Sequence, residues 1–323
     1  MSDQIKRFLK LSLKDKLWVF GNYIVLNILI KKFQNWYNFN GKYFFVNRSK
    51  NNRKLLIVVA GYKNFLWRIV FDRISNFLEN DIDVCICAPG VNPLELQKIC
   101  TKRKWSYLST KENKLSLAQN LAIKLHPRAK YIYKLDEDIF IGKNYFKNMF
   151  NTFLKIKKDN KYNFGVLVPV LNVNGVTYID FLEFVGKADE YRKIFSELKS
   201  SCMGIKCHND PQAAEYLWDN SFPFDQRVKE FEIANKNRYK IVPHRYSIGA
   251  IFFERTFFEM MGGFKVAPEG FMGIEESELC TYCFESSFPM IIACGVFAGH
   301  LGFGPQNSKM KEYFIRNIHK FEI

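Results

Sequence analysis

The chain has 323 residues, of which 48% are hydrophobic and 16% aromatic, so its length and composition exclude a domain too small for a core of its own. Lys and Arg number 48 against 32 Asp and Glu, which gives a net charge of +16. Such a surplus favours anionic partners. Because the positive charge is densest near the amino terminus, we expect a membrane surface or phosphorylated ligands and no nucleic acid.

Residues 1–50 form a basic segment that differs from the rest of the chain. Its apolar run at residues 17–30 is shorter than the ~20 residues that cross a bilayer. Two interpretations stay open: an amphipathic helical anchor on an anionic leaflet, or a helix pair that packs on the main domain or on a partner subunit. We expect the anchor, and hence a cytoplasmic protein peripheral on the inner face of the cell membrane. No cleavable signal peptide is expected.

After a polar linker at residues 47–54, short apolar runs alternate with helical patterns. This alternation predicts an α/β fold with a doubly wound, mostly parallel, Rossmann-like sheet. The expected strands are residues 55–60, 83–88, 105–108, 131–135, 164–169, 246–253 and 290–297. The expected helices are residues 66–78, 94–102, 115–125, 145–154 and 256–261, with a C-terminal helix at 311–323.

Residues 172–238 are harder to assign to elements. They contain helical stretches near residues 181–198 and 211–218, with irregular links between them. An insertion of this size in an α/β protein is typical of a lid or of a region that binds a second substrate. Its aromatic residues are interpreted either as ligand-stacking groups or as core, with core favoured for most of them. The residues concerned are Tyr178, Trp218 and the nearby Tyr246.

The most informative stretch is the apolar run at residues 131–140, which contains Asp136-Glu137-Asp138. Carboxylates are costly to bury, so we expect them at the carboxyl end of the strand, in the crevice where α/β sheets bind ligands. In an extended strand Asp136 and Asp138 share a face and Glu137 faces away. Such a pair suits Mn²⁺ or Mg²⁺, which take phosphates and waters as further ligands. The alternative is a solvated acidic turn.

Two other strand ends should meet the same crevice. Ala60, Gly61 and Tyr62 end the first strand, and Pro89 and Gly90 end the second. A glycine there lets the backbone approach a ring or a ribose, although an ordinary turn would also explain it. No GxGxxG follows the first strand and no GxxxxGK[ST] occurs, which disfavours a dehydrogenase and a P-loop protein.

A glycine-rich stretch, Gly262-Gly263-Phe264 and residues 270–273, leads into the acidic run at residues 275–278. Helix capping alone would explain Glu275 and Glu276, but such a carboxylate could also act as a general base. Later in the chain, His300 follows an apolar strand between glycines. It is interpreted either as a structural histidine or as a ligand that completes an octahedral metal site with the two aspartates.

The eight cysteines include one CxxC, Cys280 with Cys283. A zinc site would need a second pair, for which only Cys202 and Cys207-His208 are candidates, so zinc is disfavoured. Buried free thiols in a reducing cytoplasm are the preferred interpretation.

The order and spacing of these clusters over residues 55–302 resemble glycosyltransferases of the GT-A fold, most of all the inverting family 2. Asp136-Glu137-Asp138 matches that family's Asp-x-Asp. Residues 117–120 resemble its Ala-Arg-Asn, with Gln119 in place of Arg. Residues 275–279 resemble its Glu-Asp-x-Asp-Leu, with Glu276 in place of the Asp that serves as catalytic base.

The resemblance implies a set of site residues. Glu276 would be the base, and Mn²⁺ or Mg²⁺ would bind Asp136, Asp138 and His300. The donor would contact Ala60, Gly61, Tyr62, Pro89, Gly90, Gln119, Asp136 and Glu137. The acceptor would contact Gly273, Glu275 and Tyr246. Residues 51–170 would form the nucleotide-sugar half and residues 171–310 the acceptor half of one catalytic domain.

The implied activity is inverting transfer of a hexose or N-acetylhexosamine from a nucleotide-diphosphate donor, by default a UDP-sugar. The acceptor would be a glycan or a lipid-linked glycan in the synthesis of capsule or lipopolysaccharide. Three alternatives stay open: a metal-dependent nucleotidyltransferase, a nucleotide-sugar hydrolase, and a non-catalytic nucleotide-binding partner at a membrane.

Overall fold

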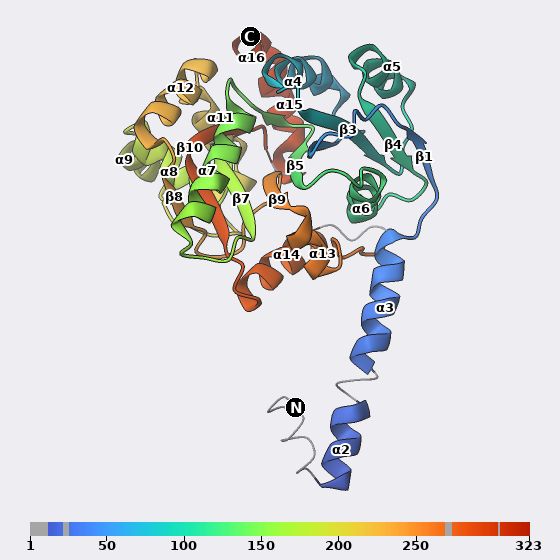
Figure 1. Ribbon diagram of the computed structural model, residues 1–323. Coiled ribbons are helices and arrows are strands. Elements are labelled where there is room, and N and C mark those ends of the chain that lie inside the picture. Colours follow the sequence, from blue (N-terminus) through green and yellow to red (C-terminus); the bar gives the residue numbers. More distant parts are fainter. Residues whose placement is uncertain (1–11, 22–25, 269–272, 303) are drawn as a thin grey trace.

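The computed structural model describes residues 12–21, 26–268, 273–302 and 304–323, and in it a ten-stranded mixed sheet forms the centre of the molecule (Figure 1). The strand order is β1-β4-β3-β2-β5-β9-β7-β10-β6, and β8 pairs with β10. The strands are β1 (Tyr43–Val46), β2 (Lys54–Val59), β3 (Ile82–Pro89), β4 (Ser106–Thr110), β5 (Tyr131–Asp136), β6 (Ile139–Phe140), β7 (Val166–Leu171), β8 (Tyr239–Ile241), β9 (Ala250–Glu254) and β10 (Met290–His300).

Six of the ten strands, β2, β3, β4, β5, β7 and β10, share one direction. β2 pairs in parallel with β3 and β5, β3 with β4, and β7 with β10. β9 is antiparallel to both β5 and β7, so these two strands share a direction. The prediction of an α/β fold with a largely parallel central sheet is therefore confirmed.

Helices cover both faces of this sheet (Figure 1). The helices are α2 (Leu13–Val19), α3 (Leu26–Phe39), α4 (Asn64–Phe77), α5 (Leu94–Arg103), α6 (Leu115–Leu125), α7 (Tyr145–Asp159), α8 (Thr177–Phe184), α9 (Ala188–Phe195), α10 (Lys206–Asn209), α11 (Pro211–Asp219), α12 (Phe224–Asn235), α13 (Arg255–Met261), α14 (Ile274–Glu285), α15 (Asn307–Arg316) and α16 (Ile318–Phe321), with a 3₁₀ turn, η2, at Gly304–Gln306.

The core forms because the central strands are apolar on both faces, as expected for a parallel sheet that has helices packed on each face. In β2, every residue from Leu55 to Val59 is buried. α4 presents Leu66, Val70 and Ile74 on one side, at the spacing of one helical face, and all three are buried. The apolar periodicity of the sequence thus determined both the strands of the sheet and the helices that pack on it.

The sequence predicts a helical segment over residues 1–50, but the last part of this segment is not helical. Residues 43–46 form β1, which pairs antiparallel with β4 and belongs to the sheet. The stretch that follows is tied down as well, because the Asp83 carboxylate accepts hydrogen bonds from the Lys50 and Asn52 backbone N–H groups. The helical part therefore ends at Phe39, and residues 47–54 are not a loose linker.

α2 and α3 form an arm that extends away from the sheet (Figure 1). Among the described residues, α3 docks on the body through its C-terminal part, from Gln34 onward. There the Asn38 side chain donates to the Gly262 carbonyl and accepts from the Val266 N–H, while Asn120 donates to the Asn38 carbonyl. In the part of the chain that the structure describes, neither arm helix nor any other has the length and apolar character to cross a bilayer.

Residues 172–238 fold as a packed helical layer over β10. The rings of Phe181 and Phe231 stack on Phe297 of this strand. α12, which the sequence analysis left unassigned, buries Phe224, Val228 and Phe231 at helical spacing. The expected strand at residues 246–253 begins only at Ala250. Residues before it are held by side chains, since Lys134 Nζ donates to the Ile248 carbonyl at 2.8 Å.

Candidate active site

The predicted crevice lies at a point where the strand order reverses. From β2 the chain proceeds through β3 and β4 on one side, and β5 then returns to the other side of β2. Ligands of open α/β sheets bind beyond the carboxyl ends of the strands at such a point. The loop after β2 carries Gly61, Tyr62 and Lys63, and the turn after β5 carries Glu137 and Asp138. The topology therefore brings these two segments together.

Asp138 is a buried carboxylate with two cationic or potentially cationic neighbours. It is 3% exposed, Lys63 Nζ forms an ion pair with its Oδ2, and His300 Nε2 lies 3.5 Å from the same oxygen. Burial acts to raise the pKa of Asp138, but the charges of Lys63 and His300 outweigh it and hold that pKa well below its usual range. Asp138 is thus kept ionised inside the protein.

His300 is fixed in one orientation. Its Nδ1 donates to the Val173 carbonyl at 2.9 Å, and its backbone N–H donates to Asn172 Oδ1 at 2.9 Å. The pairing of β6 with β10 sets His300 opposite Ile139, next to the acidic turn. Because Nδ1 carries a proton in this arrangement, Nε2 presents its lone pair toward Asp138 when the ring is neutral. This is the tautomer that binds metals through Nε2.

Asp136 ends β5 and pairs with a lysine of its own strand. Lys134 Nζ lies 2.6 Å from Asp136 Oδ1, as residues two apart on one strand face allow. Desolvation raises the pKa of Asp136, with Lys134 opposing it and the charge of Asp138 adding to it. The strand ends at Asp136, so the expected alternation through Asp138 does not hold. The two aspartates nonetheless lie close enough to interact electrostatically.

Glu137 has a structural role here and does not face a donor, which corrects its assignment. Its carboxylate is buried and accepts from the N–H groups of Gly61 and Tyr62, each at 3.0 Å, and from Trp67 Nε1 at 2.6 Å. These bonds shape the loop after β2. Gly61 has φ of +155°, and a Cβ there would lie 2.6 Å from Val91, so the turn admits glycine only.

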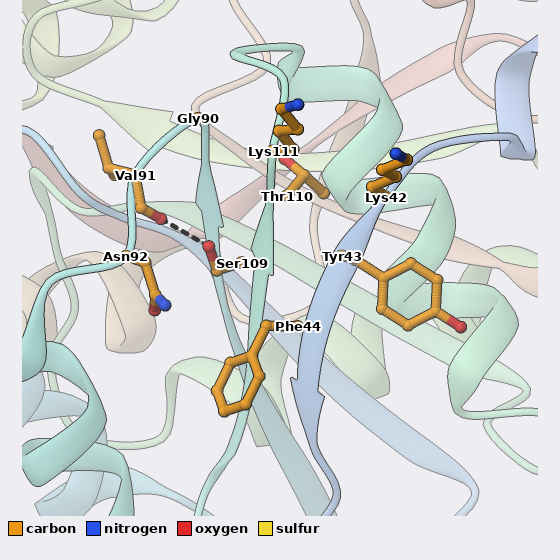
Figure 2. Close-up of a pocket in the computed structure, with 9 residues that line it drawn as sticks. All are labelled: Lys42, Tyr43, Phe44, Gly90, Val91, Asn92, Ser109, Thr110 and Lys111. Atoms are coloured by element: carbon orange, nitrogen blue, oxygen red, sulfur yellow. Dashed lines mark hydrogen bonds between the residues drawn. The ribbon is translucent and has the colours of Figure 1, made fainter.

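The other predicted donor residues lie along the same edge. The Tyr62 hydroxyl donates to the Pro89 carbonyl at 2.7 Å and so links the ends of β2 and β3. Beyond Gly90 lies an open pocket of about 380 Å³ at the ends of β3 and β4 (Figure 2). Figure 2 shows Lys42 and Lys111 at the same end of it. Its lining residues are Lys42, Tyr43, Phe44, Gly90, Val91, Asn92, Ser109, Thr110 and Lys111.

The two glutamates at the start of α14 have different environments. Glu276 pairs with Arg245 Nε at 2.8 Å and accepts from the Ile248 N–H at 3.2 Å. Glu275 is buried, which raises its pKa, and the charges of Lys134, Glu276 and Asp136 also act on it. Glu276 is connected through Ile248 to Lys134 and Asp136, and Glu275 interacts with Lys134 and Asp136 electrostatically. Gly273 precedes α14, and residues 270–272 lie outside the described part.

Two predicted ligand-binding residues are instead part of the core. Gln119 is fully buried in α6, where its Nε2 donates to the Leu115 carbonyl at 3.4 Å. Tyr246 is fully buried and donates to the Pro169 carbonyl, so it does not face an acceptor in this structure. Tyr178 and Trp218 are also fully buried, in agreement with the core interpretation. Side-chain type alone could not separate the two uses of an aromatic residue.

A divalent ion fits this site through two protein ligands and not through three. Among the described residues no three His, Cys, Asp or Glu side chains converge on one point. Asp136 is engaged by Lys134, which leaves Asp138 with His300. Their separation of 3.5 Å is near the roughly 3 Å expected between adjacent ligands of one octahedral ion. Lys63 holds Asp138 here, and its partly exposed side chain can move aside.

Lys63 and Lys134 are the site residues that the sequence analysis missed. The sequence could have identified Lys134, because a lysine in the middle of a buried strand requires a partner, and Asp136 is two residues away. Lys63 carried no such signal, since its contact with Asp138 joins residues that are 75 positions apart. Only the adjacency of β2 and β5 brings them together.

No protein-family model matches this sequence, and no curated protein matches it. Among solved structures the chain is similar to the mannosyltransferase PcManGT from Pyrobaculum calidifontis in complex with GDP-Man and Mn²⁺, at a TM-score of 0.44 and 11% identity. The match covers 85% of this chain and 65% of that one, so this chain spans less than two thirds of the neighbour's length. At this level of similarity, GDP-Man and Mn²⁺ are ligands of the neighbour and are not assigned to this chain.

Proposed function

We propose that this protein is a GT-A-type glycosyltransferase that takes a sugar from a nucleotide-diphosphate donor, by default a UDP-sugar. One observation carries the proposal: Asp138, His300 and Lys63 meet at the switch point of a mostly parallel sheet, beside a glycine turn. A buried ionised carboxylate with an imidazole nitrogen beside it suits a hard cation, and the partly exposed ammonium of Lys63 suits a phosphate. A nucleotide-sugar diphosphate supplies the phosphate oxygens that a two-residue site lacks.

The donor would lie along the strand ends from the pocket to the acidic turn. Its nucleoside would contact Gly61, Tyr62 and Gly90, where backbone is accessible, with Lys42 and Lys111 nearby. Its diphosphate would reach Lys63 and the Asp138–His300 pair. When bound there, Mn²⁺ or Mg²⁺ would supply positive charge to the leaving diphosphate. Lys63 would add a hydrogen-bonding ammonium at the same position.

The acceptor would enter from the side of α14. In the reaction, an acceptor hydroxyl forms a bond to the anomeric carbon as the bond from that carbon to the diphosphate breaks. The hydroxyl proton passes to a glutamate, and the single displacement inverts the anomeric centre. Glu276 is the base that the sequence pattern favours. Glu275 is the second candidate, because it is adjacent to Glu276 and burial raises its pKa, which strengthens it as a base.

The finer features of this function are also proposals. The sugar would be a hexose or an N-acetylhexosamine, and the acceptor a glycan or a lipid-linked glycan of a surface polysaccharide. Peripheral attachment to the inner face of the cell membrane would bring the site to such an acceptor. The rival activities are nucleotidyl transfer and hydrolysis of a nucleotide-sugar, which the same acidic crevice could also support.

Ligand binding tests the proposal first. We expect one or a few nucleotide-sugars to raise the melting temperature of the full-length protein in the presence of Mn²⁺, and free nucleoside diphosphate to do so as well. Mass spectrometry of a reaction with total glycolipid extract then identifies the product. A mass increase of one sugar in the acceptor supports transfer. Release of free sugar in its place indicates a hydrolase, and stabilisation by nucleoside triphosphates alone would overturn the proposal.

A further inference from the structure

The N-terminal arm exposes apolar side chains in two regular stripes. In α2 and the residue after it, Leu13, Leu17 and Phe20 recur at the spacing of one helical face, and in α3 Leu29, Phe33 and Trp36 do the same. Each of these six residues is at least 52% exposed. No residue of α2 is buried. Soluble proteins rarely expose apolar groups in such an ordered array without a surface to bind.

On α3 the stripe lies largely away from the docked side of the helix, and only its last residue, Trp36, borders the body, where it lines a pocket with Lys124 of α6. Asn38 anchors this helix by hydrogen bonds, with Tyr37 and Phe39 packing beside it, and the glycine turn at Gly262 lies next to Asn35. At 100° per residue, Asn38 and Asn35 project roughly opposite to Leu29, Phe33 and Trp36. The stripe is therefore left over after α3 has made its contacts with the body. Its exposure is compatible with the docking of the arm.

The charge around the stripes identifies the kind of partner. The first 50 residues hold ten Lys and Arg against two Asp, with Lys14 and Lys16 beside the α2 stripe and Lys32 beside the α3 stripe. Two copies of the arm packed together would place like charges in contact, which opposes association with a second copy. Tryptophan, phenylalanine and leucine with flanking lysines match instead the boundary between anionic headgroups and acyl chains.

The base of the arm lies at the acceptor side of the candidate site. Gln34 and Asn38 line a pocket of about 120 Å³ together with Gly263, Phe264 and Glu275. A surface bound by the arm would thus lie on the same side as α14. This placement suits an acceptor that resides in a membrane, although binding of the arm does not depend on the proposed activity.

We propose that the arm formed by α2 and α3 docks on an anionic lipid bilayer surface, with the two stripes inserted at the interface and the lysines at the headgroups. The helices lie on the membrane and do not span it. Apolar burial and attraction to anionic headgroups both contribute, so the interaction requires anionic lipid and weakens with salt.

Co-sedimentation of the full-length protein with vesicles tests this surface without an activity assay. One set of vesicles holds phosphatidylcholine alone and the other equal parts of phosphatidylcholine and phosphatidylglycerol. We expect binding to the second set only. The triple substitution L29Q/F33Q/W36Q should reduce the partition coefficient about tenfold or more, because it removes three inserted side chains. The charge reversal K14E/K16E/K32E should abolish the preference for phosphatidylglycerol.

The matched control is L94Q/I233Q, which removes two exposed apolar residues from helices outside the arm and should leave binding unchanged. Light scattering during size exclusion reports the oligomeric state of each variant. No binding of the wild type to either vesicle, or equal binding of the triple variant, would overturn the proposal. So would a wild-type oligomer that the triple substitution converts to monomers, because the stripe would then be covered by a second copy.

Discussion

The strand-end crevice and the N-terminal arm depart from ordinary side-chain placement in opposite ways. In the crevice charged groups are withdrawn from water, as Asp138 and Lys134 are, and each has a partner at short range. In the arm apolar groups such as Phe33 and Trp36 are exposed. A buried charge needs partners in defined positions, whereas an apolar stripe needs only an apolar surface. If the proposals hold, the crevice would bind one class of ligand and the arm would bind a surface without fixed geometry.

The comparison predicts that the crevice is far more sensitive to single substitutions than the arm. The largest effect is expected from Asp138→Asn, which should lower the rate of sugar transfer by about 10³-fold, since the carboxylate charge at the leaving group is lost. The fold should survive, because Lys63 can turn toward solvent. Initial rates and thermal unfolding check both statements.

The matched control for this substitution is Asp189→Asn, which removes an exposed carboxylate paired with Arg192 on α9. Its rate should equal that of the wild type. Full activity of the Asp138 variant would remove Asp138 from the mechanism and leave the crevice a structural feature only.

Substitution of each glutamate at the start of α14 distinguishes which of the two acts as the catalytic base. Substitution of the catalytic base by glutamine should lower the rate about 10²- to 10³-fold with little change in donor affinity, because only proton transfer is affected. The other variant should retain activity within roughly tenfold. Glu276→Gln is expected to be the more damaging variant, and the reverse order would assign the base to Glu275.

Glu137→Gln measures how much the hydrogen bonds of Glu137 to the loop after β2 and to Trp67 contribute to stability. A glutamine offers one acceptor oxygen and one amide donor, so at least one of the three N–H groups now bound to Glu137 would lose its partner. We expect a loss of about 2 kcal/mol in the free energy of unfolding, measured by urea denaturation. Glu312→Gln, on an exposed ion pair with Lys309, should cost less than about 0.5 kcal/mol. Equal values for the two variants would contradict the structural role.

Lys63→Met tests whether the ammonium competes with a cation for Asp138. With the competitor removed, the affinity for Mn²⁺, read from electron paramagnetic resonance of the protein without substrate, should rise about tenfold. Lys143→Met, at an exposed position in the loop before α7, is the control and should not change it. An unchanged affinity of the Lys63 variant would mean that no ion binds between Asp138 and His300.

The smallest effect on folding is expected in the arm. The triple variant L29Q/F33Q/W36Q should unfold in urea within about 0.5 kcal/mol of the wild type, because these side chains are exposed and make few contacts. A larger loss would show that the stripe packs on the body in solution. The contrast between the two regions would then disappear.

Much of the fold could be predicted from local pattern. The apolar run of β2, the spacing of Leu66, Val70 and Ile74 in α4, and the acids after β5 all reflect short-range periodicity that burial imposes. The position of the acidic turn also followed, since carboxylates cannot remain inside a sheet that is covered on both faces. Local sequence therefore determined the elements and placed Asp136 and Asp138 at the carboxyl end of β5.

The tertiary structure decided which groups meet there. Lys63 reaches Asp138 because β2 and β5 are neighbours, and His300 reaches it because β10 and β6 pair. The withdrawal of Gln119 and Tyr246 into the core, and the use of Glu137 to hold the Gly61 turn, likewise depend on packing between distant segments. Periodicity reports only whether a side chain is buried. Which group it then contacts is a long-range property of the assembled sheet.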